Sequence, residues 1–397
     1  MTGAFLTINA GSSSIKFAVF DSDAASTKPR IRGKVAGIGT TPVFSARTAG
    51  GGALDAGALA SLDVLSGHDA VIALLLPWLA THTGDRPLLA VGHRVVHGGQ
   101  DLTGPTLISP SVLEQLERLV PLAPLHQPHN IAAIRAVAKW QPDVPQVACF
   151  DTSFHRSQDR LAQLFALPRA LTDEGIIRYG FHGLSYEYIS SVLPDHLGDR
   201  ANGRVIVAHL GNGSSMCAMK DRKSAATSMG FTALDGLMMG RRCGALDPGV
   251  VLYLMQDKGL SAPEIEDILY KQSGLLGVSA ISNDMQVLQD SENPHAQEAI
   301  DLFCYRAASS LAALVPSIGG LDALIFTAGI GENSAMVRKL ICDRLSWLGA
   351  ALDDTANVRN AVQISSHQSP VDILVIPTNE EAVVARACST LLQSPTS

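Results

Sequence analysis

The chain has 397 residues, 46% of them hydrophobic, which is enough for about two to three domains with large cores. Its net charge of -7 argues against nucleic acid as a partner. The longest apolar run, 70–80, contains Pro77 and is too short to span a membrane. The chain enters its first strand without a signal-like segment, and its six cysteines form no CxxC pair. We therefore expect a cytoplasmic protein with no membrane partner and no disulfide framework.

The N-terminal segment predicts a hairpin whose tip is suited to an anion. An apolar strand over 5–8 is followed by the turn Asn9–Ser14 and a second strand over 15–20. The same pattern returns at 205–210, with a turn at Gly211–Ser215 and a strand that leaves through Met219. Glycine lacks the Cβ that would keep an anion away from backbone N–H groups. Two such tips predict two domains that face a phosphate.

Between the hairpins, the pattern predicts a strand over 91–96, helices over 111–120 and 130–140, and a buried strand over 147–150. That strand delivers Asp151 at its carboxyl end, where open α/β sheets usually place ligand-binding groups. A helix over 183–193 then precedes the second hairpin. We therefore expect a domain boundary near Asp151.

The C-terminal part predicts two further strands. The strand over 323–326 runs into a glycine-rich loop over 329–333 and then a helix, and the strand over 373–376 ends at Pro377. Thr378 and Glu381 match a capping box for the last helix, which leaves Glu380 free. The alternation of strands and helices predicts mixed α/β layers. We expect one domain from 1–150 plus 382–397, and a second from 151–381.

The first turn offers a carboxamide, three hydroxyls and an ammonium between Asn9 and Lys16. The alternative is a plain turn whose serines bond their own backbone. We favour phosphate binding because a turn alone needs only one glycine, although no Walker A pattern is present. At the second turn His209 is either a structural hydrogen-bonding group or a ligand, and the duplicated arrangement favours the ligand.

Eight ordered segments resemble acetate kinases: NAGSSSIK from Asn9, HRVVHGG from His93, FDTSFH from Phe150, YGFHG from Tyr179, HLGNGSS from His209, Gly240–Pro248, FTAGIGEN from Phe326 and TNEE from Thr378. The resemblance covers nearly the whole chain. It implies the fold of the acetate and sugar kinase, Hsp70 and actin superfamily, with two duplicated actin-like (ribonuclease H-like) domains around a central cleft. It also implies a homodimer and a C-terminal domain for nucleotide binding and dimerisation.

The resemblance implies catalytic roles for Arg94, Arg242, His182 and Asp151. The two guanidinium groups would hold the carboxylate and the transferring phosphoryl group, because a planar fork bridges anionic oxygens well. His182 would donate to the phosphoryl oxygens. Asp151 would stand near Mg²⁺, or Mn²⁺ as an alternative ion, whose ligands would be Asn9 and Glu380. The competing interpretations are ion pairs for the arginines, a buried structural His182, and a helix cap for Asp151.

The resemblance also implies two binding surfaces. The nucleotide, ATP or ADP, would contact Lys16, Ser12, Ser14, His209, Leu210, Gly211, Asn212, Gly213, Asp284, Met285, Gln286, Gly329, Ile330, Gly331 and Asn333. The acyl methyl group would contact Val96, Leu125, Phe181 and Ala233, of which the first three could equally be core residues. A GxG pair alone would also fit a tight turn. A metal site at His126 and His129 lacks further evident ligands.

Four residues depart from the family pattern. Ala233 replaces a proline of the acyl pocket, Gln286 replaces an arginine near the nucleotide, Arg241 replaces a small hydroxyl residue, and Leu184 replaces a threonine. A wider pocket could admit propionate without excluding acetate, because one methylene in such a site is worth only about 1 to 3 kcal/mol. Gln286 affects the expected purine preference.

We predict an acetate kinase that converts ATP and acetate into ADP and acetyl phosphate by direct in-line transfer. One alternative is a propionate kinase or another short-chain acyl kinase. An alternative of a different class is a nucleotide-gated binding protein of the actin or Hsp70 kind. The two arginines and His182 speak against that last class, because such a protein has no carboxylate substrate to hold.

Overall fold

The computed structural model describes residues 3–11, 13–22, 28–84 and 86–393. The chain divides into two compact units: the first contains the residues up to Phe154 and those from Asn379 onward, and the second is His155–Thr378. The predicted boundaries, at 151 and 382, differ from these by a few residues. Asp151 belongs with the first unit because its N–H donates to the Val95 carbonyl and its carboxylate pairs with Arg94.

The first unit contains a seven-stranded sheet in the order β4-β3-β2-β1-β5-β7-β6. The predicted hairpin is confirmed, because β1 and β2 pair in antiparallel register. On its other side β1 runs parallel to β5, and β5 runs parallel to β7. The strands are β1 (Ala4–Ala10), β2 (Ser14–Asp21), β3 (Ile31–Ala36), β4 (Val43–Thr48), β5 (Leu88–Val95), β6 (Thr106–Leu107) and β7 (Gln146–Phe150).

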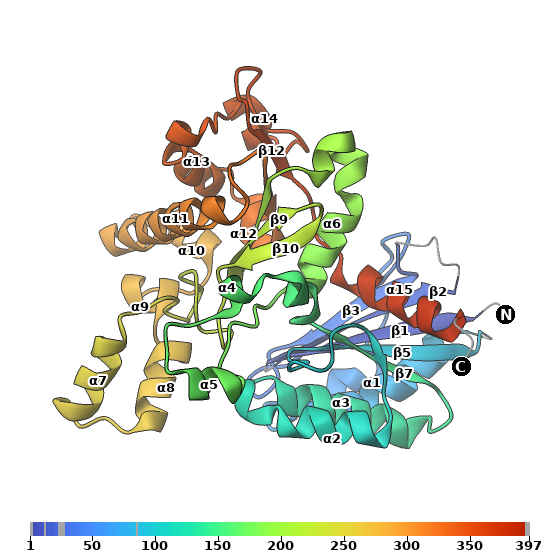
Figure 1. The fold of residues 1–397 in the computed structure, drawn as a ribbon. Coiled ribbons are helices and arrows are strands. Elements are labelled where there is room, and N and C mark those ends of the chain that lie inside the picture. Colours follow the sequence, from blue (N-terminus) through green and yellow to red (C-terminus); the bar gives the residue numbers. More distant parts are fainter. Residues whose placement is uncertain (1–2, 12, 23–27, 85, 394–397) are drawn as a thin grey trace. The chain divides into compact units, whose positions relative to one another are not determined.

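Helices cover both faces of this sheet (Figure 1). Val91 packs into a core with Ala133 of α3, whereas a Cβ at the next residue, Gly92, would come 2.3 Å from Val384 of α15. Since neighbouring strand residues point to opposite faces, α3 and α15 cover opposite sides. The helices are α1 (His68–His82), α2 (Pro110–Arg118), α3 (Gln127–Trp140) and α15 (Glu380–Gln393), with 3₁₀ turns η1 (Gly57–Ser61) and η2 (Val120–Leu122).

The second unit contains a five-stranded sheet in the order β10-β9-β8-β11-β12. It repeats the strand directions of the first sheet: β8 pairs antiparallel with β9 and parallel with β11, which runs parallel to β12. The second predicted hairpin is therefore confirmed. The strands are β8 (Val205–Leu210), β9 (Ser214–Lys220), β10 (Lys223–Thr227), β11 (Ala323–Thr327) and β12 (Asp372–Val375).

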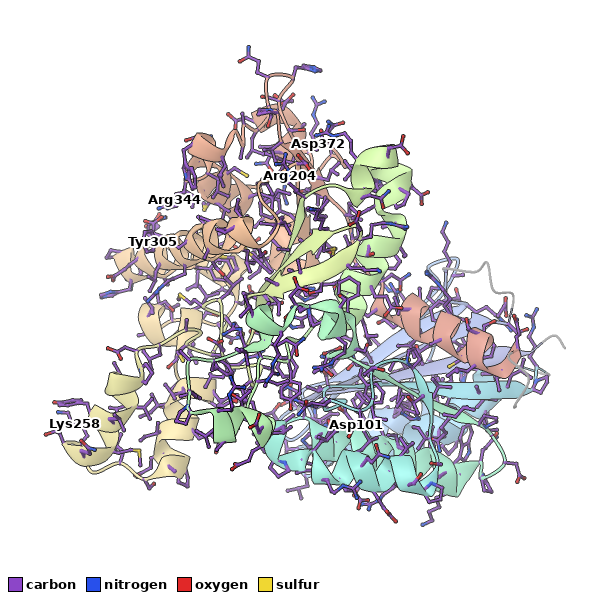
Figure 2. The ribbon with its side chains drawn as sticks, viewed as in Figure 1. Asp101, Arg204, Lys258, Tyr305, Arg344 and Asp372 are labelled. Atoms are coloured by element: carbon purple, nitrogen blue, oxygen red, sulfur yellow. The ribbon has the colours of Figure 1, made fainter. Side chains whose placement is uncertain are left out.

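The amino ends of the parallel strands in this sheet are joined by ion pairs. Arg204 precedes β8, and its Nε donates to Asp322 Oδ2 at 3.0 Å, just before β11. Arg200 pairs with Asp372 at the start of β12. Figure 2 shows Arg204 and Asp372 at the same end of the sheet. The glycine turn lies at the other end of β8.

Five helices of the second unit, α7 to α11, lie between β10 and β11 in the chain. The helices of the unit are α4 (Arg160–Gln163), α5 (Arg169–Asp173), α6 (Gly183–Leu197), α7 (Pro248–Gln256), α8 (Ala262–Lys271), α9 (Gly274–Ser279), α10 (Met285–Gln289), α11 (Pro294–Leu314), α12 (Ala328–Asn333), α13 (Ala335–Asp343) and α14 (Asp354–Val358). Four 3₁₀ turns accompany them: η3 (Ser153–Ser157), which spans the boundary between the units, η4 (Gly198–Asn202), η5 (Val315–Ser317) and η6 (Ser346–Leu348).

Helix α11 has one buried and one exposed side. Among the residues that the structure describes, Pro294–Ser317 is the one stretch whose helix could cross a membrane by length and composition. Its Ala299, Phe303 and Leu311 are buried in the core of the second unit, against α9 and α13. Tyr305, labelled in Figure 2, lies on the exposed side. A core helix passes the same test of length and composition as a membrane span.

Two local predictions were wrong. The predicted loop over 329–333 is helix α12, whose first N–H, from Ala328, donates to the Glu332 carboxylate at 2.7 Å. The side chain of Asn333 adds a bond to the Gly329 carbonyl, so these contacts support a helix despite two glycines. The predicted capping box is also wrong. Asn379, not Thr378, accepts the Ala382 N–H at the start of α15, and Glu381 pairs with Arg32.

Candidate active site

In the first unit, three neighbouring parallel strands bring Asn9, Arg94 and Asp151 together. Asn9 lies near the end of β1, Arg94 near the end of β5, and Asp151 directly after β7. Arg94 Nε donates to Asp151 Oδ1 at 3.1 Å and its Nη2 forms an ion pair with Oδ2, while Nη1 donates to Asn9 Oδ1 at 3.1 Å. The Asp151 side chain is only 1% exposed, so this carboxylate depends on the guanidinium for its charge balance.

Glu380, at the start of α15, belongs to the same group of charges. Burial raises its pKa to about 7; Arg94 lowers it and Asp151 raises it. Lys16, which is exposed on β2, also lowers this pKa. The first unit therefore gathers two carboxylates, a carboxamide and a guanidinium at the carboxyl edge of its parallel strands.

The oxygen donors of this group fit a hard divalent cation. Asn9, Asp151 and Glu380 offer two carboxylates and an amide oxygen, the type of ligand that Mg²⁺ prefers together with phosphates and water. Among the described residues, no group of three or more His, Cys, Asp or Glu side chains could hold a metal by itself. A cation here would thus use few protein ligands, as Mg²⁺ does in phosphoryl-transfer sites.

The other predicted residues of the first unit lie nearby in sequence but differ in exposure. Ser14 opens β2 and accepts the Gly11 N–H on its carbonyl at 2.8 Å, which closes the first turn. Ser12 lies outside the described residues. Val96 is buried, with its N–H bonded to Asn130 Oδ1 at 3.0 Å, whereas Leu125 is half-buried in the turn before α3.

In the second unit, the glycine turn Gly211–Gly213 meets the predicted catalytic side chains. A Cβ added at Gly213 would lie 2.7 Å from Arg242 Nη2 and 3.2 Å from His182 Nε2. Arg242 Nη1 donates to the Ala233 carbonyl at 2.6 Å, which fixes the direction of the guanidinium. A cation and an imidazole thus flank a turn that only glycine leaves open.

Two histidines stack beside this turn. The rings of His182 and His209 are 4.2 Å apart with an interplanar angle of 18°. His182 Nδ1 lies 2.8 Å from Ser215 Oγ, and His209 Nδ1 lies 2.8 Å from Ser185 Oγ. His182 precedes α6 with a φ of 58°, in the left-handed region that residues other than glycine rarely adopt. The surrounding contacts hold this ring in a defined position.

A cavity of about 420 Å³ opens on the second turn. Predicted nucleotide residues form most of its lining: Gly211, Asn212, Asp284, Met285, Gln286, Gly329, Ile330 and Asn333. Sequence reasoning missed three further lining residues, Asn283, Gln289 and Ser334. Among the predicted residues, Leu210 and Gly331 are buried and His209 stacks on His182, and none of these lines the cavity. Nor does Gly213, which faces Arg242.

The departures from the family pattern have defined surroundings. The Gln286 amide donates to both carboxylate oxygens of Asp290, at 3.0 and 3.1 Å. Arg241 is exposed, and its Nη2 lies 3.5 Å from Asn283 Oδ1 on the cavity rim. Leu184 is buried on α6. Val96 and Leu125 belong to the first unit and Phe181 and Ala233 to the second, so their grouping in one acyl pocket stays a prediction.

Comparison with known proteins gives the family. The model of the acetokinase family matches residues 4–386.

The chain belongs to the acetokinase family.

Relatives of this family resemble the chain over almost its full length. An acetate kinase of Rhodopseudomonas palustris is 51% identical over 392 residues, covering 97% of this chain and 98% of the relative. A propionate kinase structure from Francisella tularensis has a TM-score of 0.89 at 37% identity, covering 97% and 98%. An acetate kinase structure from Porphyromonas gingivalis has a TM-score of 0.85 at 33% identity, covering 98% and 100%.

The predicted family and the predicted duplicated α/β fold are therefore confirmed. The roles assigned to individual residues stay predictions. The acetokinase-type residues fall into two sets, one in each compact unit: Asn9, Arg94, Asp151 and Glu380 in the first, and His182, Arg242 and the cavity in the second.

Proposed function

We propose that this chain is an acetate kinase. An acetate oxygen forms a bond to the γ-phosphorus of ATP while the bond from that phosphorus to the bridging oxygen breaks, and the electron pair leaves with ADP. The product is acetyl phosphate, and the reaction is reversible. The family membership and the 51% identity to a protein named acetate kinase support this activity.

The observation that carries the proposal is the position of Gly213. Gly211 and Asn212 of the same turn line the cavity, while Gly213 faces Arg242 and His182. A nucleotide in the cavity with its phosphates toward the turn would bring its terminal phosphoryl group near a guanidinium and an imidazole. Because phosphoryl transfer depends mainly on positioning and charge stabilisation, these donors suit the reaction without a covalent intermediate.

The first unit supplies groups for the acceptor and for a metal. We propose that Arg94 binds the acetate carboxylate, since its planar fork pairs well with carboxylates. Asn9, Asp151 and Glu380 would hold Mg²⁺, directly or through water. A bound Mg²⁺ neutralises phosphate charge. Acetate is already ionised at neutral pH, so the reaction needs no strong general base.

Propionate is the second candidate acceptor. The chain is similar to the Francisella tularensis propionate kinase, and Ala233 gives a smaller side chain than the proline expected there. The Ala233 carbonyl still fixes Arg242, so the change alters the side chain at this position without removing the contact.

We also propose that the protein is a cytoplasmic homodimer. Helix α7 has no buried residue, and Leu252, Tyr253 and Met255 expose about half of their surface. Such an apolar patch is unusual on a monomer surface and fits a second copy of the chain. Light scattering should give twice the chain mass, and the double variant Leu252→Glu, Met255→Glu should give the monomer. A monomeric wild-type protein at micromolar concentration would contradict the dimer.

The activity is tested by incubating the protein with Mg-ATP and acetate, propionate or butyrate, and trapping the acyl phosphate with hydroxylamine. We expect acetate to give the highest kcat/KM. The variant Arg242→Ala should lose about 10²- to 10³-fold, as on removal of a preorganised charge-stabilising donor. Arg306→Ala, on the exposed side of α11, is the matched control and should keep full activity.

The outcomes separate the candidates. A higher kcat/KM for propionate would make the protein a propionate kinase. No product from any acid, with nucleotide still bound, would reject both and favour a nucleotide-gated binding protein.

A further inference from the structure

The buried Tyr186 is linked by one serine to His182, the histidine that faces the second turn. The Tyr186 hydroxyl hydrogen-bonds Ser215 Oγ, and Ser215 Oγ lies 2.8 Å from His182 Nδ1. Tyr186 and Ser215 are both fully buried. His182 and Tyr186 are four residues apart at the start of α6, and the Tyr186 N–H donates to the His182 carbonyl at 3.1 Å. The three polar groups therefore form a chain between a helix and β9.

A protonated phenol can set the direction of the hydrogens along this chain. Burial raises the pKa of Tyr186 well above its usual value, so the phenol keeps its proton at any physiological pH. Its ring neighbour His155 is itself neutral, because burial lowers the His155 pKa to about 4. A serine hydroxyl has one hydrogen and two acceptor lone pairs. If the phenol donates to Ser215, the serine hydrogen is directed to His182 Nδ1.

That direction decides which ring nitrogen of His182 carries the proton. A neutral imidazole has one N–H and one acceptor nitrogen. With Nδ1 accepting from Ser215, the proton lies on Nε2. Nε2 is the nitrogen 3.2 Å from the Cβ position of Gly213, on the side of Arg242. The reverse direction would turn an acceptor lone pair toward the proposed phosphoryl site and repel its oxygens.

We propose that Tyr186 is a positioning residue, which acts through Ser215 to keep the His182 proton on Nε2, where it can be donated to the transferring phosphoryl group. This inference rests on the function proposed above. It assigns tasks to two buried residues that do not line the cavity.

The test combines nitrogen NMR with kinetics. In protein labelled with ¹⁵N-histidine, the His182 signals, assigned by their loss in His182→Gln, should show Nε2–H and an unprotonated Nδ1. In Tyr186→Phe and in Ser215→Ala the two tautomers should mix. Each variant should lower kcat by about 10- to 100-fold, the scale of losing an orienting partner of a site histidine. The KM values for ATP and acetate should change by less than about twofold, since uniform binding is retained.

Matched variants separate orientation from general damage. Tyr179→Phe removes another buried hydroxyl, whose bond goes to the Gly175 carbonyl at 2.9 Å, and should leave the His182 signals and kcat unchanged. Ser215→Thr keeps the hydroxyl and should restore the Nε2–H signal. The double variant Tyr186→Phe, Ser215→Ala should be no slower than either single variant, because both act through one chain.

Two results would overturn the inference. One is a wild-type His182 with its proton on Nδ1. The other is an unchanged kcat and tautomer in both single variants. If the wild-type protein makes no acyl phosphate at all, the proposed function fails, while the nitrogen signals still report where the His182 proton lies.

Discussion

The two sheets of this chain share one strand arrangement but surround their glycine turns with different chemistry. In each, an antiparallel hairpin is followed on one side by parallel strands: β1 by β5 and β7, and β8 by β11 and β12. Both turns are closed by a short backbone bond, Gly11 N–H to Ser14 and Gly211 N–H to Gly213. The framework therefore places a turn next to the carboxyl ends of parallel strands twice.

The difference comes from what is added to this framework. In the first unit the strand ends themselves carry Asn9, Arg94 and Asp151, and a terminal helix adds Glu380. In the second unit, the long segment between β10 and β11 supplies Ala233, Arg242 and part of the cavity wall. The first unit thus combines two carboxylates and a carboxamide with one guanidinium. The second unit has a guanidinium and two imidazoles beside its turn and no carboxylate among these groups. The duplicated fold sets the positions, and the residues at the strand ends and on the added helices set the chemistry.

The largest expected effects come from removing one arginine of each unit. Arg94→Ala and Arg242→Ala should each lower kcat/KM by about 10²- to 10³-fold. Arg94→Ala should also destabilise the fold, by about 3–5 kcal/mol, because the buried Asp151 carboxylate loses its ion pair with this guanidinium. The Ala233 carbonyl that Arg242 contacts is half-buried and can bond water instead. Activity assays and urea unfolding measure the two quantities.

The double variant Arg94→Ala, Asp151→Asn is the control for this prediction. It also removes the buried carboxylate charge and should recover stability without recovering activity. A stability loss in Arg94→Ala no larger than that of the exposed Arg306→Ala would contradict this role of the ion pair.

Adding a Cβ to a glycine of each turn should affect activity differently in the two units. In Gly213→Ala the new methyl group would lie 2.7 Å from Arg242 Nη2, so the guanidinium has to move; in Gly11→Ala its nearest contact is 3.6 Å, to the Ser14 carbonyl. We expect about a 10- to 100-fold loss of kcat in Gly213→Ala from this displacement. The melting temperatures of both variants should stay close to that of the wild type, because the displaced atom ends a flexible side chain. A comparable kcat loss in Gly11→Ala would mean that phosphate touches the backbone of the first turn.

The sequence predicted the shared framework well. Strands such as β8 and β11 are short apolar runs with every residue buried, and the turns between strands carry glycine, so local composition reports both. The family resemblance then assigned most residues that line the cavity. These features depend on segments of a few residues, which a sequence displays directly.

Features that depend on distant contacts were not predictable in this way. Helix α12 contains two glycines and looks like a loop, but the Glu332 carboxylate accepts N–H groups from Ala328 and Thr378 and stabilises its start. Asn379 and Thr378 are both good helix caps, and only the folded chain shows which one is used. Tyr186 and Ser215 lie in separate segments, and their link to His182 appears only when α6 packs against β9.

Each unit also contains a buried neutral histidine, which gives a prediction for acid stability. Burial lowers the pKa of His93 in the first unit and of His155 in the second to about 4. The unfolded chain binds these protons near pH 6.5, so the contribution of the two histidines to stability is complete above that pH and is lost as the pH drops toward 4. The slope should be at most about 1.4 kcal/mol per pH unit for each histidine. Denaturant unfolding between pH 8 and 4.5 measures it.

Single variants assign the slope to a unit. His93→Asn and His155→Asn should each be less stable at pH 8 but show a flatter decline, whereas the exposed His196→Asn should follow the wild type. Glu380, whose pKa is raised to about 7, acts in the opposite direction, because the folded state binds a proton there that the unfolded chain has released. The difference between each variant and the wild type therefore carries the assignment, and a variant with the wild-type slope would contradict it.

The smallest effect is expected at the rim of the cavity in the second unit. The Gln286 amide donates to the Asp290 carboxylate, and both side chains are exposed. Gln286→Ala should therefore change KM for ATP by roughly twofold or less, as for other surface substitutions. Asp290→Ala is the sharper variant, since it releases the amide to bind a nucleotide, and it should alter the ratio of KM values for ATP and GTP more than Gln286→Ala does. A tenfold rise of KM for ATP in Gln286→Ala would mean that the Gln286 amide leaves Asp290 and binds the nucleotide. Gln286 would then contribute to binding in the second unit together with the glycine turn and Arg242.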